Sequence, residues 1–580
     1  MQKLSWEPIA NIGKPTFGVS FRMRVPEGWV ISNQPGASTL TGKTAVNVPD
    51  PNHTWASAEL SWEVVASLDG KGPATYRARV PGGFLLASIV GTTNSSRTLS
   101  FVADDGTWLA DPVPVPDPEP TPDPDPVPTT KWIGTNLLGV NDWCGYYPFR
   151  NFFLQSRPWI SGTTSSWSGG PALDLDARGN LRSLQPGQIA RTILFAGAQL
   201  PFDFNLRWSG KGALTFNGGT VVSQPAVNHW IVRPGNGNCH LNITAVDVSD
   251  PIRDYELTLV SQENESGIFN PDFLVEMRRY RTVRFMDVQN TNKARSQPSL
   301  ARDFIPLANL PLRVGNNGEE SLPLEMMIEL ANQAGIEPWF CINVMADQSY
   351  IDQFLNIVAA KLAPTLKCYV ELASEVWNTA PAFQSYPNIG EVGSGSEFDR
   401  RMRSYAHRSG DLAAKTKATL GARGISVLGS QNGVPYWQET LIQMIQQAGK
   451  QVPDELSIAP YFGNGLPDNG SIFDDGRLAA SATRAVDNLK ATKAIADKYK
   501  IRANCYEGGL HTIPGSTVSA DPRIEQVYRD YLAGIKTAIP GQLFAHYVLA
   551  GPWDQYGSWG EKPNQYGPST GKSRAIAAAM

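Results

Sequence analysis

Cysteine and histidine are scarce in this sequence, and their spacing matches no metal or redox motif. The 580 residues include five cysteines and six histidines, with no C-x-x-C pair. Only His240 stands beside a cysteine, Cys239, and adjacent residues of a strand point to opposite faces. The sequence therefore predicts no disulfide framework and no metal centre.

A strong net charge and long apolar runs are also missing. The formal net charge is −4 at pH 7, and without a basic field to attract phosphates we expect no nucleic-acid partner. No apolar run approaches the roughly 18 residues that a membrane helix needs. The N-terminal MQKLSWEPIANIGKPTFG lacks the apolar core of a secretory signal. We therefore expect a soluble chain with no membrane insertion and no export signal.

Motifs for phosphate-bearing cofactors and for several hydrolase classes are absent too. The segment GPSTGKS at 567–573 has one residue too few between its glycines for a phosphate loop, and it follows no strand. Neither a G-x-S-x-G nor an H-E-x-x-H motif occurs. The sequence therefore predicts no cofactor.

Tryptophan, by contrast, is abundant. The chain holds 16 tryptophans, and aromatic faces stack on the apolar C–H faces of sugar rings. This composition favours glycans as ligands. With 41% hydrophobic residues over 580 positions, the chain is also too long for one ordinary domain, so we expect two to four.

A proline-rich segment divides the chain. Over 111–130 the sequence reads DPVPVPDPEPTPDPDPVPTT, with proline at every second position from Pro112 to Pro128 and five acidic residues. Each proline disfavours helix in the residue before it, so the segment predicts an extended rod of roughly 50 Å at about 3.1 Å per residue. We interpret 111–130 as a linker.

The residues before the linker are typical of a β-sandwich. Residues 1–110 show short alternating runs broken by glycine, proline, asparagine and aspartate. Such a module would bind a glycan or attach the protein to a larger assembly. Its tryptophans serve as glycan platforms or as core, and we favour core because large aromatic side chains are usually buried.

After the linker, helices alternate regularly with apolar strands. The first strand is GTNLLGVNDW at 134–143, and residues 160–262 then read as a β-rich domain inserted between the first and second strands. Eight strands in βα order predict a (β/α)₈ barrel over 131–580. The seven later helices are expected at 271–278, 323–334, 350–362, 399–421, 437–448, 478–499 and 521–537, and the strands that follow them at 281–287, 337–344, 367–375, 425–432, 455–462, 501–509 and 543–551.

Acidic residues stand where several of these strands end. Asp287 ends the second strand, Glu375 the fourth and Glu507 the seventh. In such barrels the chemistry lies at the carboxyl ends of the strands. Two carboxylates facing one another across that mouth are what a retaining glycosidase needs, one as proton donor and one as nucleophile.

These positions resemble the large clan of retaining (β/α)₈ glycoside hydrolases, which includes cellulases, mannanases and β-galactosidases. The resemblance covers roughly residues 131–580, and the phrases RFMD, ELASEVWN and YEGG are similar to a bacterial and phage branch of that clan. It implies that Glu375 is the acid/base and Glu507 the nucleophile. It further implies that Arg284 hydrogen-bonds the nucleophile, that Asn432 and Tyr461 support the site, and that Trp553 is the sugar platform.

One position departs from the clan. Asn usually precedes the acid/base and holds the sugar 2-OH, whereas Ser374 stands there in this chain, which puts turnover in doubt more than binding. Glu371 has the same strand parity as Glu375, and we expect it to support Arg284.

Aromatic residues and a histidine near these strand ends have open roles. Trp553, Tyr556 and Trp559 serve as sugar platforms or as a packed loop. His511, four residues past Glu507, is a further candidate for substrate binding, although such a histidine is more often a rim or core residue.

Two functions remain open from the sequence. The first is a retaining glycosidase that acts on a bacterial surface polysaccharide by double displacement, with Arg284 keeping Glu507 ionised and the proximity of Glu507 keeping Glu375 protonated. The second is a phage tail or baseplate protein that recognises host glycan with little or no hydrolysis and docks through residues 1–110. Either origin, phage or secreted bacterial enzyme, predicts an extracellular or virion location.

Overall fold

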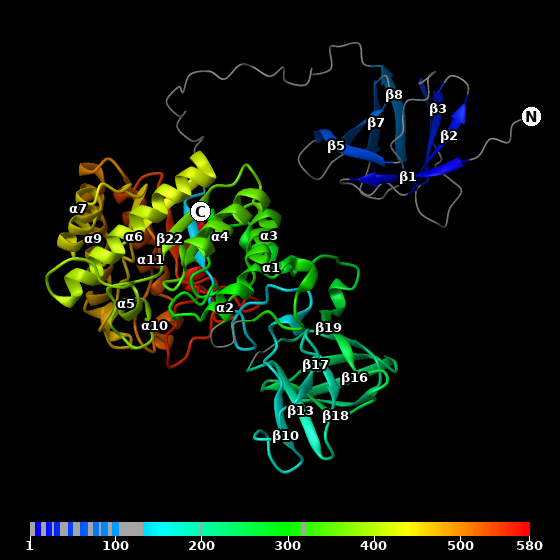
Figure 1. The fold of residues 1–580 in the computed structure, drawn as a ribbon, viewed down its shortest axis with the longest axis horizontal. Helices are drawn as coiled ribbons and strands as arrows, with labels where there is room; N and C mark the ends of the chain where they lie inside the picture. The colour runs from blue at the N-terminus through cyan, green and yellow to red at the C-terminus, as the bar shows by residue number, and fades with distance from the viewer. Residues whose placement is uncertain are drawn as a thin grey trace, which may run out of the picture. The chain divides into compact units, whose positions relative to one another are not determined.

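The computed structural model describes residues 131–580 apart from 198–199 and 316–319, together with the backbone of eight strands between residues 6 and 103 (Figure 1). The chain separates into two compact units, Met1–Asp125 and Pro126–Met580. Each unit is described by itself below. The linker predicted at 111–130 lies outside the described residues.

The N-terminal unit contains eight strands that pair in the order β4-β3-β2-β1-β5-β6-β7-β8. Neighbours are antiparallel except β1 and β5, which pair in parallel. Because the side chains of this unit lie outside the described part, the β-sandwich and its role as an attachment or carbohydrate-binding module stay predictions. The strands are β1 (Trp6–Ile12), β2 (Val19–Val25), β3 (Gly28–Gln34), β4 (Thr44–Pro49), β5 (Glu59–Ser67), β6 (Ala74–Val80), β7 (Gly83–Val90) and β8 (Ser96–Ala103).

The second unit is built on a closed barrel of eight parallel strands, which confirms the predicted barrel. The strands follow one another around the barrel in chain order, and the last, β26, pairs with the first, β9. They are β9 (Ile133–Asn136), β20 (Thr282–Arg284), β21 (Glu337–Ile342), β22 (Cys368–Leu372), β23 (Gly424–Gly429), β24 (Glu455–Ile458), β25 (Arg502–Cys505) and β26 (Phe544–His546).

Alternation along the strands gives the barrel two apolar layers. Trp339 and Cys341 of β21 pack in the barrel interior with Tyr369 of β22. Phe340 and Ile342, the alternate residues of β21, join the larger core between strands and helices. Because successive side chains of a strand point to opposite faces, a strand buried on both sides reads as a continuous apolar run, and this is why the runs were visible in the sequence.

The helices that return the chain between strands lie within a few residues of their predicted positions. In the described part of the chain, no helix is both long and apolar enough to cross a lipid bilayer. The helices are α1 (Pro271–Met277), α2 (Gln297–Ala301), α3 (Leu324–Ala334), α4 (Gln348–Lys361), α5 (Ser385–Asn388), α6 (Glu397–Leu420), α7 (Pro435–Gln447), α8 (Ser471–Asp474), α9 (Arg477–Lys498), α10 (Ser516–Ala520), α11 (Ile524–Ala538) and α12 (Gly571–Ala579).

Additional all-β sheets are formed by the segment that comes between the first and second barrel strands in the sequence. Two four-stranded sheets, β10-β13-β18-β15 and β16-β17-β14-β19, accompany a β11-β12 pair (Figure 1). They enclose an apolar core of their own that includes Leu194, Phe204 and Leu241. A separate domain with the boundaries 160–262 stays a prediction. The strands are β10 (Ile160–Thr163), β11 (Asp174–Leu175), β12 (Leu181–Ser183), β13 (Gln188–Phe195), β14 (Phe204–Ser209), β15 (Gly212–Asn217), β16 (Gly219–Ala226), β17 (His229–Pro234), β18 (Cys239–Val246) and β19 (Arg253–Leu259).

Candidate active site

A cavity of about 670 Å³ lies at the carboxyl ends of the barrel strands. Glu375 follows β22, Glu507 follows β25 and Tyr547 follows β26, and all three line this cavity. Seven residues that the sequence singled out are among its walls: Ser374, Glu375, Asn432, Tyr461, Glu507, His511 and Trp559. The structure thus brings most of the predicted site residues to one place.

Glu507 is held through both of its carboxyl oxygens. Arg284 Nη1 donates a hydrogen bond to Oε1 at 2.7 Å, and the Tyr461 hydroxyl donates to Oε2 at 2.7 Å. Only 6% of Glu507 is exposed to solvent. The side chain is therefore fixed in one orientation at the wall of the cavity.

Glu375 sits in a more open position on the same cavity. The Tyr506 hydroxyl donates to its Oε1 at 3.0 Å, and Asn378 Nδ2 donates to its Oε2 at 2.9 Å. Ala373 and Glu375 have φ angles of +56° and +43°, in the left-handed region that non-glycine residues rarely adopt. Such conformations store about 1–3 kcal/mol each and are concentrated at functional sites.

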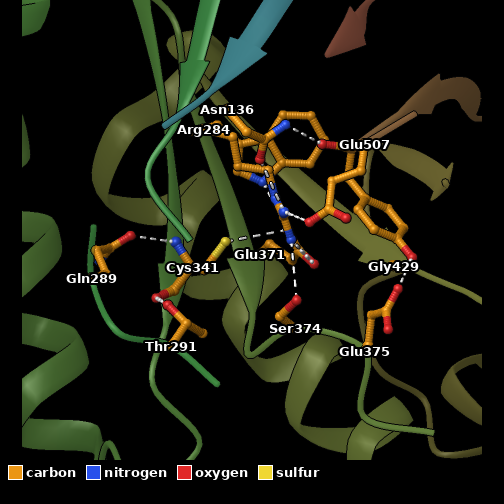
Figure 2. A network of polar contacts seen from close by, with 12 residues as sticks. Asn136, Arg284, Gln289, Thr291, Cys341, Glu371, Ser374, Glu375, Gly429 and Glu507 are labelled. Atoms are coloured by element: carbon orange, nitrogen blue, oxygen red, sulfur yellow. Dashed lines mark hydrogen bonds and ion pairs between the residues drawn. The ribbon is translucent and has the colours of Figure 1, made fainter. Parts of the chain in front are cut away.

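Arg284 is fully buried beneath the cavity and donates hydrogen bonds to two carboxyl groups, those of Glu507 and Glu371 (Figure 2). Besides Glu507, it donates from Nε to Glu371 Oε2 at 3.0 Å and from Nη2 to Glu371 Oε1 at 3.2 Å. Trp339 Nε1 also donates to Glu371 Oε2, at 2.9 Å. These contacts confirm the expectation that Glu371 supports Arg284 from inside the barrel.

Burial changes the charge state expected for Glu507. Loss of solvent raises the pKa of Glu507 to about 8, and the nearby Glu375 carboxylate adds to the rise, whereas Arg284 and Tyr461 lower it. The sequence-based expectation was that Arg284 keeps Glu507 ionised. The contact exists, but the single guanidinium is shared with Glu371, and burial outweighs its effect.

The remaining predicted residues take different positions. Ser374, 1% exposed, accepts a weak hydrogen bond from Arg284 Nη2 at 3.4 Å. The buried Oδ1 of Asn432 has no hydrogen-bond partner among the described residues, so it is an acceptor ready for a ligand hydroxyl. Burial lowers the pKa of His511, which favours a neutral imidazole. Asp287 lies in an adjoining cavity, where it accepts a hydrogen bond from Tyr547 at 2.7 Å.

The structure does not bring Trp553 to the carboxylates. Its ring lines another cavity, and its Nε1 donates to the Gly560 carbonyl at 3.1 Å. Trp559, which lies in the same loop, lines the cavity of Glu375 and Glu507 instead. The loop has no periodic pattern, so its sequence could not distinguish between the two tryptophans.

Three contributors were missed by sequence reasoning. Tyr506 and Asn378 donate to Glu375, and Tyr547 lines two cavities. Asn378 closes the phrase ELASEVWN three residues after Glu375, which is a signal that could have been used. No local pattern marks Tyr506, which directly precedes Glu507 in the phrase YEGG.

No group of three or more metal-ligating side chains occurs within the described residues. The polar groups around the cavity include carboxylates, hydroxyls, amides and the His511 imidazole, which suit sugar hydroxyls and proton transfer. The arrangement can therefore combine a fixed carboxyl group with a more accessible one on a single bound molecule.

Comparison with known proteins gives only weak likenesses. No family model and no curated protein sequence matches the chain. An α-L-arabinofuranosidase from Thermotoga maritima aligns with a TM-score of 0.36 and 13% identity, covering 53% of this chain and 63% of that one. A family 51 α-L-arabinofuranosidase from Bifidobacterium longum gives 0.39 and 15%, covering 54% and 66%.

A modular endo-β-1,4-mannanase from Cellulomonas fimi gives a TM-score of 0.31 and 11% identity, covering 51% of this chain and 62% of that one. The chain thus spans less than two thirds of the length of each of these three proteins. Likenesses this weak do not bear on activity or substrate.

Proposed function

We propose that the barrel is a retaining glycoside hydrolase that cleaves a polysaccharide, with bacterial surface glycan as the expected substrate. The observation that carries this proposal is the pairing of Glu375 and Glu507 on one cavity in unlike surroundings. Glu507 is rigid and buried, as a nucleophile must be to meet an anomeric carbon. Glu375 is more exposed, as suits a group that exchanges protons with a leaving group and with water.

The reaction is a double displacement. In the first step a Glu507 oxygen attacks the anomeric carbon, the bond to the leaving oxygen breaks, and Glu375 gives its proton to that oxygen. In the second step Glu375 takes a proton from water, and the water oxygen attacks the anomeric carbon and releases Glu507. Glu507 must be ionised to attack the anomeric carbon. Because its pKa is raised to about 8, the ionised form becomes more populated as the pH approaches 8.

The test uses activated substrates and the two carboxyl variants. Glu507→Gly should be inactive on 4-nitrophenyl glycosides until azide is added, and the azide product should have inverted anomeric configuration. Glu375→Gly with azide should give a product of retained configuration. Glu455→Gln is the matched control: Glu455 is buried and paired with Arg502 at 2.8 Å, but it begins β24 at the other end of the barrel. If azide rescues neither glutamate variant, the assigned roles are wrong.

The alternative is recognition of a host glycan with little or no hydrolysis. Ser374 in place of the longer amide and the raised pKa of Glu507 both favour slow turnover. In that case the barrel would act as a lectin on a phage tail or baseplate, attached through residues 1–110. A screen of Glu507→Ala against bacterial surface glycans identifies the ligand, and wild-type protein that binds this ligand for hours without releasing sugar would favour recognition alone.

A further inference from the structure

Three cavities of the barrel unit adjoin one another. The cavity of Glu375 and Glu507 shares Tyr547 with a second cavity of about 350 Å³. The second shares Trp143, Cys144 and Pro552 with a third cavity of about 480 Å³. Shared lining residues place the three cavities in a row, with the second between the other two, and we call this row the groove.

The far part of this groove is built by the barrel and the inserted sheets together. Ala196 and Gly197, which follow β13, line the third cavity. Trp553 and Tyr566, which come after the last barrel strand, line it as well. The insertion between the first two barrel strands thus forms a wall of a groove that begins at the carboxylate pair.

Trp143 is a rigid and accessible ring on this groove. Its side chain is 49% exposed, which is unusual for tryptophan, and it lines both the second and the third cavities. The Arg157 guanidinium lies 5.3 Å from the ring centroid. Arg157 is itself fixed by two hydrogen bonds to Asp142, at 3.1 and 2.8 Å. A ring held in this way can stack on a ligand at little entropic cost.

Trp553 repeats the same arrangement in the third cavity. The Lys572 ammonium lies 4.6 Å from its ring centroid, and Lys572 is buried and bonded to the Ser558 carbonyl. The indole N–H is used by the Gly560 carbonyl. Each of the two tryptophans thus lies against a basic side chain that is itself hydrogen-bonded, Arg157 for Trp143 and Lys572 for Trp553.

The groove is acidic. Four carboxyl groups line the three cavities, and no lysine or arginine is among their described lining residues. Arg157 is neutralised by Asp142, and Lys572 is fully buried. Asp142 is paired with Arg157 and Glu507 with Arg284, so the described lining offers an anionic polysaccharide no basic side chain that could balance its charge. The four carboxyl groups belong to Asp142, Asp287, Glu375 and Glu507.

We propose that these three cavities bind one continuous, uncharged polysaccharide chain, with Trp143 and Trp553 as stacking platforms beyond the carboxylate pair. The inference rests on the proposed function for the first cavity and adds the class of substrate: a polymer rather than a small glycoside, without uronic or sialic acid units. The inserted sheets then serve to extend the binding groove.

The test measures binding of the full chain carrying Glu507→Gln, which prevents cleavage. Native gels contain a neutral polysaccharide (a neutral bacterial surface polysaccharide, mannan, arabinan, xylan or β-glucan) or the acidic polygalacturonate. At least one neutral polymer should retard the protein, and polygalacturonate should not. Adding Trp143→Ala or Trp553→Ala should weaken that binding about two- to twelve-fold, the range for one aromatic stacking contact.

Control variants separate stacking from misfolding. Trp167→Ala is the matched control, because Trp167 is 45% exposed and lies under Arg191 at 5.2 Å but lines none of the three cavities. It should bind like the parent protein. Trp143→Phe and Trp553→Phe keep an aromatic face and should restore most of the binding.

Several outcomes overturn the proposal. They are stronger retardation by polygalacturonate than by any neutral polymer, no retardation by any neutral polymer, and unchanged binding in both alanine variants. The result is independent of the proposed hydrolysis. If wild-type protein binds a neutral polymer through both tryptophans but cleaves nothing, the groove stands and the glycosidase proposal fails. If the Trp143→Ala and Trp553→Ala variants of the otherwise wild-type protein cleave a polymer as well as the wild type does, the glycosidase proposal stands and the groove proposal fails.

Discussion

Replacing Glu507 by glutamine removes an ionisable group while keeping the shape of the side chain. The amide oxygen can still accept from Arg284, and the Tyr461 hydroxyl can turn to accept from the amide nitrogen. In the wild type, burial raises the pKa of Glu507 from an ordinary value of 4.5 to about 8. Between these two pH values the unfolded chain has lost the proton and the folded protein retains it. Rising pH therefore favours the unfolded state of the wild type but not of Glu507→Gln.

The size of the effect follows from the shift. A difference of about 3.5 pH units corresponds to about 5 kcal/mol, which is present below pH 4.5 and lost as the pH rises through 8. Unfolding entropy is about 2.1 cal/mol/K per residue, so a barrel unit of about 450 residues changes its Tm by about 1 °C per kcal/mol. We expect Glu507→Gln to gain about 5 °C relative to the wild type between pH 4.5 and 8.

The assay is thermal unfolding of both proteins across this pH range. The quantity of interest is the difference in Tm between them, because Glu561 and Lys572, whose pKa values burial brings to about 7, titrate in both proteins. In parallel, kcat/KM of the wild type on an activated aryl glycoside, whose leaving group needs no proton from Glu375, should rise towards pH 8 as Glu507 ionises. A Tm difference that stays constant from pH 4.5 to 8 would refute the reasoning. It would mean that Arg284 keeps Glu507 ionised, as the sequence alone suggested.

Three further changes test the neighbours of the carboxylate pair. Ser374→Asn should raise kcat/KM on the polysaccharide substrate about two- to twelve-fold, the value of one neutral hydrogen bond of about 0.5–1.5 kcal/mol to the sugar; unchanged kinetics would mean that the serine already serves it. Glu375→Gln should abolish hydrolysis of substrates with poor leaving groups but spare activated aryl glycosides, as rates on the two substrate types will reveal. Glu371→Gln removes a competing negative charge from Arg284, so the acid limb of the pH–rate profile should move to lower pH; a limb that does not move would contradict the shared use of Arg284.

The barrel was predictable because its signals are local. A strand buried on both faces is a continuous apolar run, and an amphipathic helix follows each run. This regular alternation leaves few other secondary-structure assignments for the segment. The acids at the strand ends could then be placed by counting, since parallel strands end on one face of the barrel. Even the inward orientation of Glu371 followed from the period of two along β22.

Other parts of the site depend on contacts that no local pattern encodes. The loop after β26 holds Trp553, Tyr556 and Trp559 within a few residues, and which of them meets the cavity is decided by packing against distant groups such as Lys572. Burial is equally invisible along the chain. The sequence predicted the contact of Arg284 with Glu507, but the loss of solvent around Glu507 depends on the whole barrel.

The arrangement of Arg284 explains why orientation and charge stabilisation oppose one another in this site. A buried guanidinium with a single partner would be free to rotate about its long side chain. Glu371 and Trp339 prevent this, because Glu371 engages Nε and Nη2 and accepts from the indole N–H, which leaves Nη1 directed at Glu507. The same contact adds a second carboxylate to one positive charge, so less of that charge stabilises ionised Glu507. In the proposed reaction, the same contacts that orient the Glu507 carboxyl group towards the cavity would also raise the pH at which it ionises, so the fold of the barrel interior would set the pH range of the reaction.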